Sequence, residues 1–374
     1  MLFIPHKHLY ISGTSYVSSD ELDYKEVITD ANLRRRMGRL LKMAVWCGLK
    51  SLDGVPSERV AGIITSTGAG FMKDTISFGS SIFDREETLL NPSPFMQSTF
   101  NTASGYIALI RKIHAYNTTY VQQADGFAAS LLDAAMLLDD AGEGNVALVG
   151  AFDEVTPEVD VIRQRLGLYR VGDGFLPLGE GAAAFLLSAA MPTDVSESCR
   201  ATEMSAGPGG NDGSESASER GGDANSECST GHLCESESAS ASERGGDEAG
   251  SESAYEHGGK SGSESSSELL HESGGTSSRS LNGTKDGNAD LRFCGLANLS
   301  DLPKCAENPI AELFGINAGV NVISCADHVE SLGAFRSMLP VLLCKLISEQ
   351  QIPDGYTAIM DDVNEDGVII LLHK

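Results

Sequence analysis

Thiols are the side chains best suited to attack a thioester, and the chain has eight cysteines. Four lie in apolar stretches: Cys47, Cys294, Cys325 and Cys344. Cys228 and Cys234 flank His232, but this spacing matches no common zinc module, so neither a metal nor another cofactor is expected. The scatter follows no disulfide pattern, and the reduced thiols of a cytoplasmic protein are the simpler interpretation.

Histidine is the usual proton carrier near neutral pH. His328 stands just before a predicted long helix at 330–350. His6, His8 and His114 stand in no motif and are expected at the surface. Histidines alone therefore assign no chemistry to the chain.

Charge and hydropathy exclude several classes of function. The 374 residues include 27 Lys and Arg against 53 Asp and Glu, a formal net charge of −26. Such an acidic chain repels phosphates, so nucleic-acid binding is not expected as its main role. Its apolar runs are far shorter than the ~20 residues of a membrane-spanning helix, and no secretory signal is expected. We therefore expect a cytoplasmic protein without membrane contact.

Half of the charge excess lies in one low-complexity stretch. Residues 195–290 contain 19 acidic and 6 basic residues, and the octapeptide at 216–223 recurs at 240–247. A segment with one aromatic residue cannot bury enough apolar surface to offset its ordering entropy. We expect a disordered insertion at 191–290 between an N-terminal half, 1–190, and a shortened C-terminal half, 291–374.

Outside that stretch, helical and strand patterns alternate, which is typical of α/β layering. The main predicted helices are 33–52, 101–113, 126–140 and 330–350. The main predicted strands are 8–15, 60–66, 118–122, 145–152, 181–188, 320–325, 356–361 and 367–373.

Four runs in this frame resemble the β-ketoacyl synthase branch of the thiolase superfamily. The most specific is Gly172–Leu187, similar to that family's Asp-Gly-Phe…Gly-Glu-Gly-Ala signature. The others, in a matching order, are Arg36–Ala44, Ser98–Gly105 and Asn145–Asp153. The resemblance implies the five-layered α-β-α-β-α thiolase-like fold with two similar halves, and dimerisation.

The family's nucleophilic cysteine lies between a strand and a helix, three residues before a glycine. Counting back from Gly126 puts Gln123 at that position. An amide offers only hydrogen bonds and cannot attack a thioester, so condensation by this chain alone is not expected. One family histidine aligns with Asp301, and His328 resembles a relic of the other.

The resemblance leaves three functions open. Chain-length factors, the non-condensing partners of polyketide and related synthases, carry Gln at the cysteine position, and a partner of this kind is favoured. It would form a heterodimer with an active ketosynthase in fatty-acid, polyketide or polyene biosynthesis. A malonyl-carrier-protein decarboxylase and a homodimeric, non-enzymatic scaffold are the alternatives, so activity as an acyltransferase or decarboxylase stays uncertain.

Two further sets of residues follow from the partner interpretation. Bulky side chains would close the far end of an acyl tunnel, and the candidates are Phe100, Tyr106 and Phe127, although ordinary core positions explain them at least as well. The densest group of cations could dock an acidic acyl carrier protein, although a solvated helix face is the favoured explanation. This group is Arg34, Arg35, Arg36, Arg39 and Lys42.

Overall fold

The computed structural model describes residues 2–18, 22–122, 125–142, 144–189, 279–281, 290–364 and 367–374. The predicted insertion at 191–290 lies almost wholly outside these ranges, and so does Gln123. None of the described helices is long and apolar enough to cross a membrane.

The first half of the chain forms five neighbouring strands of one mixed sheet. In spatial order they are β2 (Leu9–Val17), β8 (Gly181–Ser188), β5 (Val146–Asp153), β3 (Val60–Ser66) and β4 (Tyr116–Tyr120). β3 runs parallel to both β4 and β5, whereas β8 pairs antiparallel with β5 and with β2. Parallel strands need crossover helices, which explains the alternation seen in the sequence.

The second half repeats this arrangement with one described strand fewer. Its order is β10 (Arg292–Asn298), β13 (Val368–His373), β12 (Tyr356–Met360) and β11 (Val320–Ser324). β13 is antiparallel to β10 and to β12, and β11 is parallel to β12. β2 and β10 pair antiparallel and join the halves. β11 lies beside β12 as β3 lies beside β5, so β4 is the strand without a described counterpart, and the expected two similar halves are confirmed.

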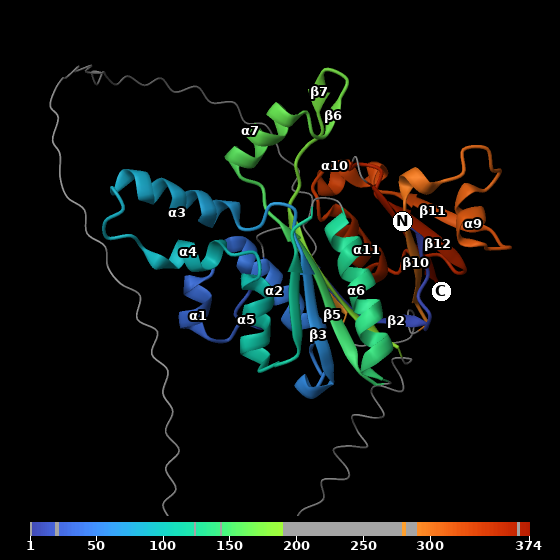
Figure 1. The fold of residues 1–374 in the computed structure, drawn as a ribbon, viewed down its shortest axis with the longest axis horizontal. Coiled ribbons are helices and arrows are strands. Elements are labelled where there is room, and N and C mark those ends of the chain that lie inside the picture. Colours follow the sequence, from blue (N-terminus) through green and yellow to red (C-terminus); the bar gives the residue numbers. More distant parts are fainter. Residues whose placement is uncertain are drawn as a thin grey trace, which may run out of the picture. The chain divides into compact units, whose positions relative to one another are not determined.

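Helices complete five layers (Figure 1). α6 (Asp125–Ala141) and α11 (Met338–Ser348) pack between the two half-sheets, and α2 (Arg39–Ser51) and α5 (Thr102–Arg111) cover the other face of the first. α9 (Pro309–Phe314) covers the outer face of the second. Strand β8 is buried on both faces, because alternate side chains enter the central and the outer core.

Most of the other elements are short, and several surround the carboxyl ends of the parallel strands. They are β1 (Leu2–Phe3), α1 (Ala31–Arg36), η1 (Ser57–Arg59), α3 (Met72–Asp84), α4 (Pro92–Ser98), α7 (Pro157–Leu166), β6 (Arg170–Val171), β7 (Gly174–Phe175), β9 (Arg279–Leu281), η2 (Leu299–Asp301), η3 (Ala326–His328) and α10 (Val329–Leu332).

Two predicted helices are each divided in the structure. The helix expected at 330–350 breaks at Gly333, which has φ +74° and lies against Gly179 so closely that no Cβ would fit. Hydrogen bonds between segment 177–179 and Ala334 replace the helical ones at this point. The helix expected at 33–52 breaks before Gly38, whose N–H donates to the Gln97 side chain at 2.9 Å.

Candidate functional site

The edge strand β4 leads into α6 through the segment where the resemblance expects a nucleophile. The carbonyl oxygen of Tyr120, the last residue of β4, accepts a hydrogen bond from the Thr67 N–H at 3.0 Å. A Cβ on Gly126 would lie 3.4 Å from the Cβ of Ser66, so the start of α6 packs against the end of β3. Gln123 is not among the described residues, and its predicted role stays a prediction.

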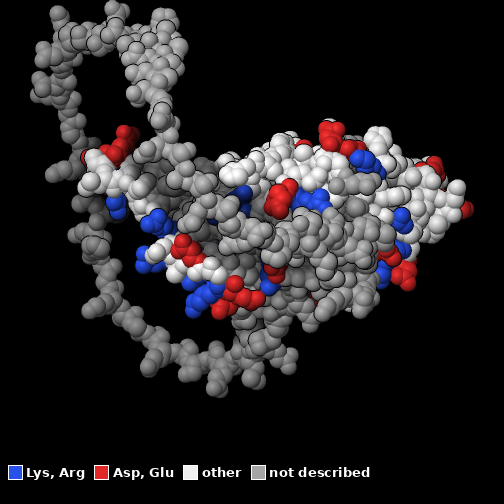
Figure 2. Space-filling view, turned by 90° about the horizontal axis from the view of Figure 1, so that it is seen from below, with Lys and Arg blue, Asp and Glu red and all other residues white. Residues whose placement is uncertain are grey.

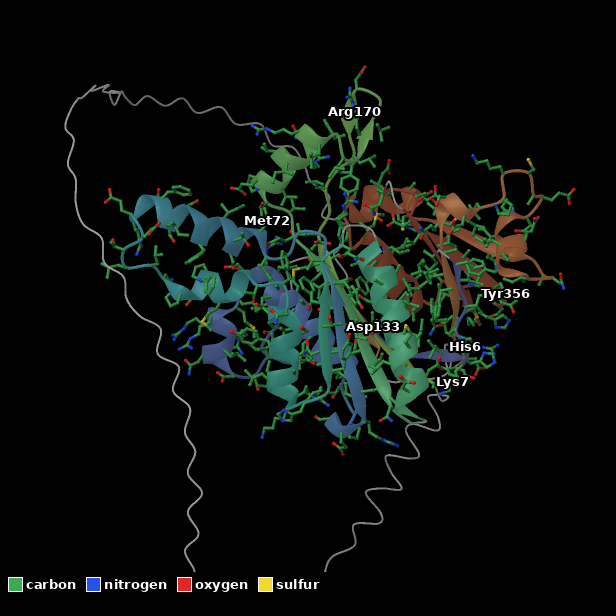
Figure 3. All side chains as sticks on the ribbon, in the orientation of Figure 1. His6, Lys7, Met72, Asp133, Arg170 and Tyr356 are labelled. Carbon is green, nitrogen blue, oxygen red and sulfur yellow. The ribbon has the colours of Figure 1, made fainter. Side chains whose placement is uncertain are left out.

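Two tyrosines of β4 fix its position against α6. The hydroxyls of Tyr116 and Tyr120 both donate to Oδ2 of Asp133, each at 3.0 Å, and Asp133 lies on α6 (Figure 3). Burial and the Asp133 carboxylate raise the pKa of Tyr120 to about 12. Tyr120 therefore stays a neutral donor at physiological pH.

β11 is the edge strand of the second half, as β4 is of the first, and the turn after it contains Cys325 and His328. His328 is half-buried, and its N–H donates to the Cys325 carbonyl at 3.0 Å. Asp362 of the β12–β13 hairpin fixes this turn by accepting from the Ser324 hydroxyl at 2.5 Å and from the Ala326 N–H at 2.9 Å. Whether His328 is a relic of a catalytic histidine stays a prediction.

Burial makes most of the described thiols poor nucleophiles, because the thiolate is the reactive form. The buried cysteines in the described part are Cys47, Cys325 and Cys344. Burial raises the pKa of all three, and the carboxylates of Asp361 and Asp362 raise that of Cys325 further. Burial also raises the pKa of Cys294 to about 11. The exposed Cys305 lies in the loop before α9, in the outer layer.

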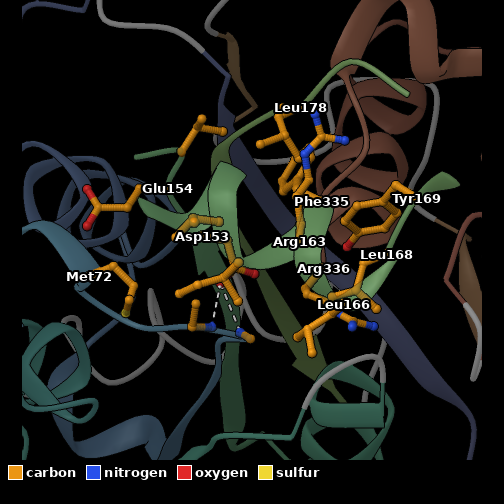
Figure 4. Close-up of a pocket in the computed structure, with 16 residues that line it drawn as sticks. Met72, Asp153, Glu154, Arg163, Leu166, Leu168, Tyr169, Leu178, Phe335 and Arg336 are labelled. Carbon is orange, nitrogen blue, oxygen red and sulfur yellow. Dashed lines mark hydrogen bonds between the residues drawn. The ribbon is translucent and has the colours of Figure 1, made fainter. Parts of the chain in front are cut away.

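A cavity of about 200 Å³ lies at the carboxyl ends of β3 and β5, under α7 (Figure 4). Both halves contribute to its lining: Gly68 and Ala69 follow β3, Asp153 ends β5, and Phe335 and Arg336 precede α11. None of the described candidate site residues lines this cavity, although Asp153, Leu178 and Gly179 belong to runs that carry the family resemblance. It is the main feature of the site that motif reasoning missed.

Asp153 joins the two halves at the cavity wall. Its Oδ1 accepts hydrogen bonds from the Thr67 hydroxyl at 3.0 Å and from the N–H groups of Gly68 and Ala69 at 2.9 and 3.1 Å. Its Oδ2 accepts from the Ser337 hydroxyl at 2.6 Å. Burial raises the pKa of Asp153, and the four hydrogen bonds oppose this shift.

A second polar network closes the cavity on the side of the second half. The Tyr169 hydroxyl donates to Oδ1 of Asn364 at 2.9 Å, and the Asn364 amide donates to both Asp361 oxygens at 2.9 and 2.7 Å. The Arg336 guanidinium lies 5.8 Å from the Tyr169 ring centroid. Burial raises the pKa of Asp361 to about 6, against the hydrogen bonds from Asn364.

The three predicted tunnel residues lie in different layers. Phe100 is 44% exposed, and it borders a surface hollow with residues 117–119 of β4. Phe127 is buried in the central core, 5.5 Å from the Phe185 ring. Tyr106 is half-buried against the outer core under α2 and α5. The structure therefore does not gather the three around one channel.

The predicted docking cations differ in availability. Arg39 forms a bidentate ion pair with Glu180, and Arg34 donates to two main-chain carbonyls just before α1. Arg35 and Arg36 are exposed. On the face seen in Figure 2, basic and acidic side chains alternate over the described surface. Carrier-protein docking through these cations stays a prediction.

Comparison with solved structures supports the fold. The structure titled "The ishigamide ketosynthase/chain length factor" has a TM-score of 0.56 at 12% identity, covering 98% of each chain. A type II polyketide synthase (PKS) acyl-carrier protein in complex with its ketosynthase bound to the hexaketide (AntDE:AntF) gives 0.57 at 13% identity, covering 98% of this chain and 99% of the other. No curated protein sequence matches.

A sequence family identifies the chain more directly. The family described as "Beta-ketoacyl synthase, N-terminal domain" matches residues 18–221, more than half of the 374 residues. This range includes four of the five strands of the first half-sheet, β3, β4, β5 and β8, and the helix α6 that follows β4. The match, the five layers and the repeated half-sheet agree, and the chain belongs to the β-ketoacyl synthase family.

Proposed function

We propose that this chain is a non-condensing subunit that partners an active ketosynthase, in the manner of a chain-length factor, in polyketide or related acyl-chain synthesis. The observation that carries the proposal is Gln123 at the junction of β4 and α6, where a condensing enzyme needs a thiolate. The buried thiols support it, because the burial that raises their pKa values makes them poor substitutes.

The edge of the first half-sheet supports a partner. Among the described strands, β4 pairs only with β3. Large apolar side chains flank this edge: Leu109 on α5 is 69% exposed, Tyr116 on β4 is 45% exposed, and Met136 on α6 is 60% exposed. An unpaired strand edge with apolar neighbours favours strand-to-strand association. A ketosynthase with the same fold would continue the sheet across a pseudo-two-fold axis.

Phe100 is the best placed of the predicted tunnel residues in such a dimer. Its ring packs on Gly70, where a Cβ would lie 2.5 Å from the ring, and it borders the hollow beside β4. A rigid aromatic side chain beside the interface could limit the length of a growing chain by steric exclusion.

Co-production with a tagged ketosynthase that keeps its cysteine tests the proposal. We expect a 1:1 complex by light scattering, and we expect Leu109→Asp and Met136→Asp to weaken it by about tenfold or more, because each places a charge in the apolar contact. Val161→Asp, at a 48% exposed position on α7, is the matched control.

Activity assays separate the alternatives. The purified chain should not elongate an acyl carrier substrate, and elongation without a partner would contradict the proposal. Carbon dioxide release from malonyl carrier protein by the chain alone would favour the decarboxylase. Failure to bind any ketosynthase or carrier protein would favour the scaffold.

A further inference from the structure

The strand β11 forms the outer edge of the second half-sheet (Figure 1). Within the part of the chain that the structure describes, β11 pairs only with β12, in parallel, from Val320 opposite Tyr356 to Ser324 opposite Met360. In the first half, β4 lies outside β3, whereas no described strand lies outside β11. The second half therefore has an open place for one more strand.

Alternate backbone groups of β11 point away from β12. Directly after β11, the Cys325 N–H donates to the Met360 carbonyl at 2.9 Å. Because backbone direction alternates along a strand, the groups of every second residue before Cys325 also face β12. The N–H and C=O groups of Val320, Val322 and Ser324 consequently face outward, where an added strand would bond to them.

The described edge lacks the features that usually protect an edge strand from pairing, which are proline, lysine, inward-facing charges and β-bulges. The run Val-Asn-Val-Ile-Ser has no proline and no charge, and its register with β12 is continuous. Asn321 and Val322 point to opposite faces of the sheet, yet both are exposed, Val322 at 53%. No described helix therefore covers the middle of β11 on either face.

The surroundings of this edge are acidic. Residues 305–335, which include β11, contain four acidic residues and neither Lys nor Arg. Two of the four, Asp327 and Glu330, are exposed just after β11. Asp362 is also exposed, and it accepts a hydrogen bond from the Ser324 hydroxyl at the end of the strand. Two copies of this edge would bring like charges together, whereas a segment rich in Lys or Arg would meet opposite charges.

We propose that the outer edge of β11 binds an extended, basic segment of a partner protein as one more strand of the second half-sheet. Backbone hydrogen bonds to Val320, Val322 and Ser324 provide the attachment, and the neighbouring carboxylates select a basic segment over an acidic one. This edge and β4 lie at opposite ends of the sheet, so the site is separate from the proposed ketosynthase interface.

Fluorescence anisotropy on the full chain tests this with a fluorescein-labelled nonapeptide of alternating lysine and valine. Binding should saturate, and the peptide with glutamate in place of lysine should bind about tenfold more weakly or worse. Raising NaCl from about 0.05 to 0.5 M should weaken binding several-fold. Methylating every backbone nitrogen of the peptide should abolish binding, whereas methylating every second one should reduce it little, because one edge of the added strand keeps its donors.

Variants of the chain separate the backbone contribution from the charge. Val322→Pro removes an outward N–H and leaves the ladder to β12 intact, so it should weaken peptide binding by about tenfold or more with little change in melting temperature. Asp327→Lys should weaken binding several-fold, and Asp173→Lys, at an exposed position in the β6–β7 turn, should change it by less than about twofold. Hydrogen exchange in residues 320–324 should slow on binding.

Equal binding of the lysine and glutamate peptides, binding that survives full N-methylation, or equal effects of Asp327→Lys and Asp173→Lys would overturn the inference. A dimer of the purified chain that Val322→Pro dissociates would identify a second copy as the occupant and would also overturn it. Leu109→Asp, beside β4 at the other end of the sheet, should leave peptide binding unchanged. A failure to pair with a ketosynthase and a failure to bind the basic peptide are therefore separate results.

Discussion

Replacing Asp153 tests how strongly one buried carboxylate holds the two halves together. Asp153→Ala removes the acceptor of four hydrogen bonds, from the Thr67 and Ser337 hydroxyls and from two backbone N–H groups. Asp153→Asn keeps one oxygen for the three donors at Oδ1, and its amide can donate to the Ser337 hydroxyl oxygen. Asparagine keeps the volume of the side chain, whereas alanine also removes three heavy atoms, and the two variants leave different numbers of donors without an acceptor.

The expected costs follow from the count of orphaned donors. Each buried donor left without an acceptor costs about 1–3 kcal/mol, so Asp153→Ala should lower the free energy of unfolding by about 4 kcal/mol or more. Asp153 borders the cavity, where water could reach some donors and keep the cost near this lower value. Asp153→Asn should cost about 1 kcal/mol, the net value of one rearranged hydrogen bond.

Urea unfolding followed by tryptophan fluorescence provides the measurement. Trp46 is the sole tryptophan, lies on α2 and is 4% exposed, so its emission reports loss of the first-half core. Because stabilities of about 5–15 kcal/mol are typical, a loss of 4 kcal/mol shifts the urea midpoint clearly. Equal costs for the two variants, or a cost below about 1 kcal/mol for alanine, would refute the assigned network.

Two further predictions concern the second half and its contact with the first. Burial raises the pKa of Asp361 to about 6 in the folded protein, so the stability contributed by its protonated form is present below the unfolded pKa and is lost as pH rises through 6. Asp361→Asn should therefore flatten the decline in unfolding free energy between about pH 4 and 7, measured by urea titrations. An unchanged slope would refute this, and the exposed Asp327→Asn is the control. Gly179→Ala would put a Cβ into the Leu332 carbonyl oxygen, so it should lower the melting temperature by several degrees or prevent folding. Gly319→Ala, where a Cβ would meet nothing within 4 Å, should leave the melting temperature nearly unchanged. Similar melting temperatures for the two variants would contradict the close contact.

The layered fold could be predicted from the sequence because its signals are periodic and local. Strands β3, β5 and β8 are buried on nearly every residue and appear as short apolar runs with turn residues around them. The four runs that resemble the family, of which Gly172–Leu187 is the most specific, indicated the layered fold by their order and spacing. The break between α10 and α11 could not be predicted in this way. It occurs at Gly333, which packs against Gly179, a residue more than 150 positions away in the sequence.

The cavity was missed for a different physical reason. Its wall residues Val159, Ile162 and Leu166 have the spacing of an ordinary amphipathic helix, and periodicity cannot distinguish a face that packs on a core from one that covers a cavity. The Thr156–Pro157 pair, an N-cap followed by a proline in the first turn, was the available signal for α7 itself. Only the tertiary arrangement places that face opposite Phe335 of the second half.

The two ends of the site bear on the proposed non-condensing role. The junctions after β4 and after β11 each follow the edge strand of their half and precede a helix of the central layer. Gln123 belongs to the first junction, and in the second Cys325 is buried beside two carboxylates that disfavour its thiolate. The residues best connected by hydrogen bonds, Asp153 and Asn364, link the loops of one half to those of the other. Such bonds reinforce the shape of the site rather than supply a nucleophile, which favours a role in holding or measuring an acyl chain over a role in condensing it.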